Sequence, residues 1–176
     1  MRILFTVAAA ALLGLHPQHP STLPAPSNPG RAAPAISLKT LDGKTVRLSD
    51  SRGRIVLVDF WATWCTPCRI TFPALDALSA SFRDHDVDVL AVNEDEHRKN
   101  VNAFLEAHPH SMRVLLDAQM TAADAFNVRG IPSAFIIDRD GRVRFSHLGY
   151  TPETIDAFRR EITSLLEPLQ ADPRGR

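Results

Sequence analysis

The chain has 176 residues, its 20 Lys and Arg residues are balanced by 20 Asp and Glu residues, and 44% of its residues are apolar. This composition is typical of a globular domain. The lack of net positive charge argues against a protein that binds nucleic acid or a polybasic membrane-surface protein. Only two cysteines are present, which excludes a disulfide-rich scaffold and a four-cysteine zinc site.

The amino terminus has the pattern of an export signal. Met1-Arg2 precedes an apolar run that ends at Leu15. A membrane span needs about 20 apolar residues, so this run is shorter than a span and has the length of a signal-peptide core. We therefore expect residues 1–15 to direct export, either as a cleaved signal peptide or as a short anchor that is retained.

Proline marks the boundaries of the folded region. Six of the 13 prolines lie within residues 16–35, and because proline fixes φ and lacks an N–H group we expect a linker there without helix or sheet. Residues 167–176 also contain two prolines, and we expect a flexible tail. Residues 36–166 remain as a single domain, which is long enough to bury its own core.

Strands and helices are predicted to alternate along this domain. Residues 36–38 and 45–48 flank Asp42-Gly43, the signature of a hairpin. The nearly continuous apolar run at residues 55–60 predicts a strand covered on both faces. A helix follows Cys68, and Pro73 predicts a kink in it.

The second half of the domain continues the pattern. The final helix is expected to begin with Thr151 as its N-cap and Pro152 at its first position. Before it, apolar spacing predicts two helices, at residues 98–107 and 118–126, and four strands, at residues 87–92, 113–116, 133–137 and 142–147. This order predicts a layered α/β domain.

The residues that indicate chemistry are Cys65-Thr66-Pro67-Cys68, placed between a buried strand and a helix. The unpaired N–H groups and the dipole at a helix start favour an anion. We therefore expect the pKa of the Cys65 thiol to be lowered and its thiolate to be favoured. Cys68 lies one turn further along and is expected to be more buried, which makes it the thiol that resolves a mixed disulfide.

Three other interpretations of the pair are weaker. A structural disulfide across two residues restrains the unfolded chain very little. A metal site needs further ligands, and the histidines of the chain lack suitable spacing. Two inert buried cysteines do not explain the placement between strand and helix.

Two segments resemble the thioredoxin superfamily. Residues 58–69 (VDFWATWCTPCR) are similar to its active-site segment, most of all in the exported thiol–disulfide reductases of the TlpA/ResA-like family. Residues 128–138 (VRGIPSAFIID) resemble the segment that carries the cis-proline of the superfamily, here Pro132. The resemblance implies a thioredoxin-like α/β fold with a central mixed sheet flanked by helices, an amino-terminal hairpin and a central helix–strand insertion at residues 98–116. Peroxiredoxin-like proteins share such an insertion but place their reactive cysteine in a different local pattern.

Two acidic residues compete for the role of proton acceptor from Cys68. A carboxylate that ends an apolar strand is poorly solvated, so we expect a raised pKa for Asp59, although its side chain could instead turn to solvent. The resembling proteins often have Asn there and take their acid from the loop after the next strand, where Glu96 aligns. Thr71 is a further departure, since those proteins often carry Glu at that place.

The substrate is expected to bind around Cys65. The resemblance places the backbone of Ile131 and Pro132 beside the thiols, where an extended target segment would pair with it. Trp64, Thr66 and Pro67 would complete this surface, with core packing as the alternative for Trp64.

The leading hypothesis is an exported, periplasmic disulfide reductase that needs no cofactor beyond the redox-active disulfide Cys65–Cys68 and no metal. The resemblance implies protein disulfide substrates, a role in cytochrome c maturation, a membrane thiol reductase as electron donor, a monomer, and no nucleic-acid partner. Because Thr66-Pro67 supplies no cation between the cysteines, a reducing potential is favoured over that of a disulfide-donating oxidant. A metal- or peptide-binding module is the remaining alternative.

Overall fold

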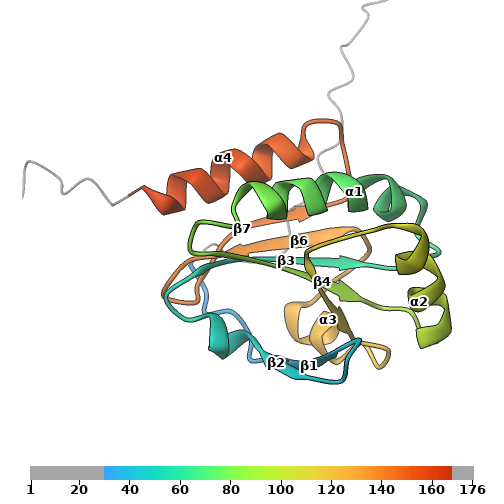
Figure 1. Ribbon diagram of the computed structural model, residues 1–176. Coiled ribbons are helices and arrows are strands. Elements are labelled where there is room, and N and C mark those ends of the chain that lie inside the picture. The colour runs from blue at the N-terminus through green and yellow to red at the C-terminus, as the bar shows by residue number, and fades with distance from the viewer. Residues whose placement is uncertain (1–29, 168–176) are drawn as a thin grey trace, which may run out of the picture.

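The computed structural model describes residues 30–167, and the predictions for residues 1–29 and 168–176 lie outside this range. Within it, seven strands form one mixed sheet in the order β2-β1-β5-β4-β3-β6-β7 (Figure 1). The strands are β1 (Ser37–Thr40), β2 (Thr45–Arg47), β3 (Ile55–Trp61), β4 (Val87–Asn93), β5 (Arg113–Leu116), β6 (Ser133–Ile137) and β7 (Val143–Leu148). The predicted thioredoxin-like α/β fold is confirmed, including its amino-terminal hairpin and its central helix–strand insertion.

Helices cover both faces of the sheet. Helices α1 (Thr66–Ser81), α2 (Arg98–Ala107) and α4 (Thr154–Leu166) pack on one face, and α3 (Thr121–Phe126) packs on the other with the short 3-10 helix η1 (Leu48–Ser51) (Figure 1). Every residue of β3 is buried. The continuous apolar run of this strand is explained by its two covered faces.

The topology brings several loops to one edge of the sheet. Strands β3, β4 and β5 run parallel, so their carboxyl ends lie together. Strand β6 is antiparallel to β3 and begins at the same edge, where Ser133 pairs with Phe60. We call this the disulfide edge, because it gathers the segment from Ala62 to Cys65, the loop after β4 and the loop that contains Pro132.

Helix boundaries differ from the sequence predictions at three places. Helix α1 begins at Thr66, before Cys68, and continues past Pro73 to Ser81. Helix α3 begins at Thr121 because Met120 has a φ of 56°, a left-handed conformation that does not belong to a helix. The other strand and helix ends, apart from that of α4, agree with prediction to within two residues.

The predicted N-cap of the last helix, Thr151, is also wrong. Helix α4 begins at Thr154, and its N-cap is Glu153. The backbone N–H of Thr151 donates to the Thr154 hydroxyl, 2.9 Å away, and the Thr154 N–H donates back to the Thr151 carbonyl at 3.0 Å. These bonds close a separate turn before the helix starts.

The last residues of the predicted linker, which was expected at residues 16–35, are part of the folded unit. The N–H of Gly30 donates to the Val143 carbonyl at 2.7 Å, and Ala32 forms an isolated bridge with Arg142. The four residues from Gly30 to Ala33 contain no proline, so their N–H groups are able to join a sheet edge. No helix in the described chain has the length and apolar character that a membrane span requires.

Candidate active site

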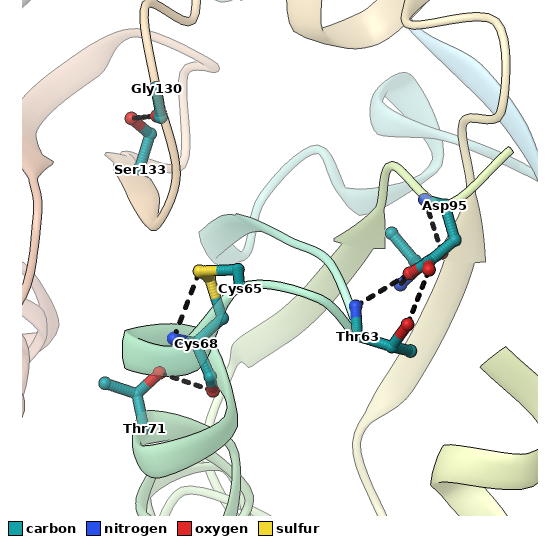
Figure 2. The surroundings of a disulfide bond; sticks show 8 residues. Thr63, Cys65, Cys68, Thr71, Asp95, Gly130 and Ser133 are labelled. Atoms are coloured by element: carbon teal, nitrogen blue, oxygen red, sulfur yellow. Dashed lines mark hydrogen bonds between the residues drawn. A yellow bond between two sulfur atoms is a disulfide. The ribbon is translucent and has the colours of Figure 1, made fainter. Parts of the chain in front are cut away.

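The two cysteines form a disulfide at the start of α1 (Figure 2). The Sγ atoms of Cys65 and Cys68 are 1.99 Å apart. Cys65 is the N-cap of α1, and its sulfur accepts a hydrogen bond from the Cys68 N–H at 3.2 Å. Cys65 is 5% exposed and Cys68 is 1% exposed. As predicted, Cys65 lies at the helix start and is the more accessible of the two.

The turn before Cys65 is held by the loop that follows β4. The Asp95 carboxylate accepts bonds from the Thr63 N–H at 2.8 Å and from the Thr63 hydroxyl at 2.5 Å. It also accepts a bond from the side-chain amide of Asn93 at 2.8 Å. Figure 2 shows this network beside the disulfide. The sequence alone did not predict this network, although the polar residues Asn93, Glu94 and Asp95, which directly follow a predicted buried strand, were a visible signal.

The loop before β6 lies across from the disulfide (Figure 2). The Ile131–Pro132 peptide bond is cis, as the resemblance implied. The Ser133 hydroxyl donates to the Gly130 carbonyl at 2.6 Å and closes the loop. Pro132 also lines a small pocket, together with Asp59 and Thr71. The pocket therefore joins the proline loop, helix α1 and strand β3.

Asp59 is buried in the middle of the sheet. It lies between Ala91 of β4 and Ala134 of β6 and is 6% exposed. Burial raises the pKa of Asp59 to about 8, and the neighbouring charge of Glu94 adds to the rise. The burial and the direction of the pKa change are both as predicted, and the alternative of a side chain turned to solvent is wrong.

Of the two glutamates that follow β4, the buried one is Glu94, and not Glu96. Glu96 is exposed. Glu94 is 9% exposed, and burial raises its pKa to about 7, with a further contribution from the charge of Asp117. Its N–H donates to the Trp61 carbonyl at 2.9 Å, which extends the β3–β4 pairing by one residue and brings Glu94 under cover. Glu96 lies beyond the end of this pairing.

One oxygen of Glu94 has no partner. Its Oε1 atom is buried and makes no hydrogen bond with any described residue, and the same holds for the indole nitrogen of Trp61. A buried carboxylate oxygen without a donor disfavours the ionised form. This agrees with the raised pKa of Glu94.

The two tryptophans occupy different environments. Trp61 is 1% exposed and packs against Phe72 and Phe104, with ring centroids 4.7 Å and 5.2 Å away. Trp64, directly before Cys65, is 67% exposed. Core packing is therefore the environment of Trp61, and Trp64 lies at the surface.

The other residues predicted to bind substrate lie near the same edge. Thr66 and Pro67 are exposed in the first turn of α1, and Ile131 is half-buried in the proline loop. Ile70 is a further apolar side chain on α1, 61% exposed, that the sequence analysis did not single out. Within residues 30–167, no three His, Cys, Asp or Glu side chains are grouped as metal ligands would be.

Comparisons with known proteins identify the family of the chain. A sequence model described as the AhpC/TSA family matches residues 29–146. The thioredoxin-like protein YneN of Bacillus subtilis is 38% identical over 123 residues, which cover 68% of this chain and 71% of that protein. The thiol-disulfide oxidoreductase ResA of Geobacillus thermodenitrificans is 36% identical over 115 residues, which cover 65% of this chain and 66% of that protein.

A solved structure has a similar fold. A protein of Chlorobium tepidum described as a thiol:disulfide interchange protein DsbE superposes with a TM-score of 0.76 at 34% identity, covering 80% of this chain and 99% of that one. A redox-active cysteine pair on a thioredoxin-like fold defines a thiol–disulfide oxidoreductase, and that is the class of this enzyme. The chain belongs to the AhpC/TSA family of thioredoxin-like proteins, and its similarity to ResA confirms the expected TlpA/ResA-like branch.

Proposed function

We propose that this oxidoreductase is exported to the periplasm and reduces disulfides in extracytoplasmic proteins. The observation that carries the proposal is the Cys65–Cys68 pair at the start of α1, next to the exposed Trp64 and across from the Pro132 loop. The apolar run of residues 1–15 supports export, with a cleaved signal and a retained anchor as the two forms of the proposal.

The proposed reaction begins with the reduced enzyme. The Cys65 thiolate, favoured at the helix start, attacks one sulfur of a target disulfide, and the other target sulfur leaves. Cys68 then attacks the sulfur of Cys65 in the mixed disulfide. The target leaves with both of its cysteines reduced, and the enzyme keeps the two-electron oxidised pair Cys65–Cys68.

The second step needs a proton acceptor for Cys68. Asp59 is suited to this role because its pKa of about 8 lets it exist in both forms near neutral pH. It shares the pocket with Thr71, whose hydroxyl donates to the Cys68 carbonyl at 2.9 Å. Glu94 influences the proton affinity of Asp59 through its charge, and Glu96 has no part in the proposed step.

The target is proposed to bind as an extended segment. The backbone of Ile131 and Pro132 would pair with it, while Trp64, Thr66 and Pro67 would contact its side chains. Cysteine-bearing exported proteins, including apocytochromes c, are the proposed targets. A membrane thiol reductase is the proposed electron donor, because exported compartments do not keep thiols reduced, and the enzyme is proposed to act as a monomer.

The direction of electron flow is tested by the reduction potential. The protein is equilibrated with glutathione buffers of graded ratio, and the fraction of Cys65–Cys68 disulfide is measured by thiol alkylation. The absence of a cation at Thr66-Pro67 predicts a potential near the roughly −270 mV of thioredoxin. A value near about −120 mV would instead identify a disulfide-donating oxidant.

A further inference from the structure

We propose that Asp95 is a positioning residue that fixes Cys65 at the start of α1, an inference that rests on the proposed function of Cys65 as the attacking thiolate. The Asp95 side chain contacts neither sulfur in the bonds described above. It acts through Thr63, two residues before Cys65, to which it is joined by two hydrogen bonds.

The turn from Ala62 to Cys65 has two fixed points. Ala62 is fully buried and follows β3 directly, and its carbonyl accepts the N–H of Cys65 at 3.2 Å. Thr63 is fixed by Asp95, through both its backbone and its side chain. Trp64 projects into solvent between these contacts and Cys65. A displacement of Thr63 is therefore transmitted directly to Trp64 and Cys65.

Asp95 is itself rigidly held. It is 3% exposed, and its neighbour Asn93 is fully buried. Asn93 donates to the Asp95 carboxylate and accepts the Asp95 N–H at 3.0 Å, so the two residues bind each other reciprocally. This anchor belongs to the end of β4, which pairs with β3 over its full length. Asp95 and Asn93 thus connect Thr63 to the sheet through hydrogen bonds.

The chemistry of Asp95 favours positioning over general stabilisation. Burying a carboxylate is costly unless donors or cations compensate it. No Lys, Arg or His within the described residues forms an ion pair with Asp95. Its charge is met by three short hydrogen bonds, two of them from Thr63. Most of the hydrogen bonds that compensate the buried Asp95 carboxylate therefore come from the turn that carries the active-site cysteine.

The test is the pH profile of Cys65 alkylation by iodoacetamide in the reduced, full-length protein. Loss of the hydrogen bonds between Asp95 and Thr63 is expected to move the Cys65 sulfur away from the helix start, which favours the thiol over the thiolate. In Asp95→Ala we expect the midpoint to rise by about one pH unit, equivalent to about tenfold slower alkylation below the midpoint. Thr63→Val, which loses the hydroxyl bond and keeps the Asp95 charge, should move the midpoint the same way. Thr63→Ser should behave like the wild type.

A matched control separates positioning from stability. The Asp76 carboxylate also accepts one hydroxyl and two backbone N–H bonds, from Ser111 and Met112, but it holds the segment before β5. Asp76→Ala should lower the unfolding free energy and leave the alkylation profile unchanged. A folded Asp95→Ala or Thr63→Val with the wild-type profile would overturn the inference.

Two further outcomes have separate meanings. Removing the negative charge of Asp95 by itself would lower the midpoint. If Asp95→Ala lowers it and Thr63→Val leaves it unchanged, Asp95 acts by charge, and the positioning role is wrong. If wild-type Cys65 is alkylated no faster than Cys68, the proposed function fails, whatever the variants do.

Discussion

Trp61 and Trp64 are three residues apart and lie in opposite environments, with exposed fractions of 1% and 67%. Trp61 ends β3 and completes an aromatic cluster with Phe72 and Phe104. Trp64 follows the turn held by Asp95 and projects from the disulfide edge. The same residue type therefore serves packing at one position and is available for recognition at the other.

The two positions should respond differently to truncation. Trp64→Ala should leave the free energy of unfolding within about 0.5 kcal/mol of wild type, and it should raise KM for a protein disulfide because an exposed contact is lost. Trp61→Ala should cost about 3–5 kcal/mol of stability. Urea unfolding and insulin-disulfide reduction measure the two effects. An unchanged KM in Trp64→Ala would remove Trp64 from the proposed substrate surface.

The two cysteines should have separable roles. In Cys68→Ser, the Cys65 thiolate should still attack a target but should not be released, so a mixed disulfide accumulates. In Cys65→Ser no mixed disulfide should form. Non-reducing electrophoresis and mass spectrometry of the trapped species identify the linked cysteine. Accumulation in Cys65→Ser, with none in Cys68→Ser, would reverse the proposed order of attack.

Asp59 should make the stability of the oxidised protein depend on pH. Its pKa is about 8 in the folded protein, against about 3.9 in an unfolded chain. Between these values the folded protein holds a proton that the unfolded chain releases, so the free energy of unfolding falls as pH rises from about 4 to about 8. Above pH 8 this contribution no longer changes.

Replacing Asp59 with Asn removes this ionisation. The free energy of unfolding of Asp59→Asn, relative to that of the wild type, should therefore increase by on the order of 3–5 kcal/mol as the pH rises from about 4 to about 8. A smaller slope remains because the pKa of Glu94 is also raised, to about 7. Urea unfolding at a series of pH values measures the difference, with the exposed Asp84→Asn as control. Parallel curves for Asp59→Asn and wild type would contradict a raised pKa.

Glu94 and Glu96 should differ in their effect on Asp59. The charge of Glu94 contributes to the raised pKa of Asp59, so Glu94→Gln should lower that pKa from about 8 towards its ordinary value. Glu96→Gln should leave it unchanged, since Glu96 is exposed. Carbon NMR of the Asp59 carboxyl during a pH titration of the oxidised protein measures both. Equal shifts in the two variants would contradict the assignment of Glu94 as the coupled acid.

Local sequence determines much of this site. The apolar run before Asp59 predicts the buried strand, and the position of Cys65 between strand and helix predicts its place as N-cap. The resemblance supplies the cis bond before Pro132. These features depend on a few adjacent residues, whose pattern is read directly from the chain.

Features that depend on distant pairing could not be predicted in the same way. Whether Glu94 or Glu96 is the buried acid depends on how far the β3–β4 pairing extends, and one N–H···O bond from Glu94 to Trp61 extends it by one residue. The turn held by Asp95 depends on a contact between residues 32 positions apart in the chain. The start of α3 depends on the left-handed conformation of Met120, a residue type that rarely adopts it.

The bridge between Ala32 and Arg142 fixes the point at which the described chain joins the sheet. Arg142 directly precedes β7, which runs from the far end of the sheet towards the start of β6. The polypeptide thus enters the domain on the side opposite Cys65. A bilayer anchor or a fused partner upstream of Gly30 would therefore be joined to the domain at the end of the sheet away from the two sulfur atoms.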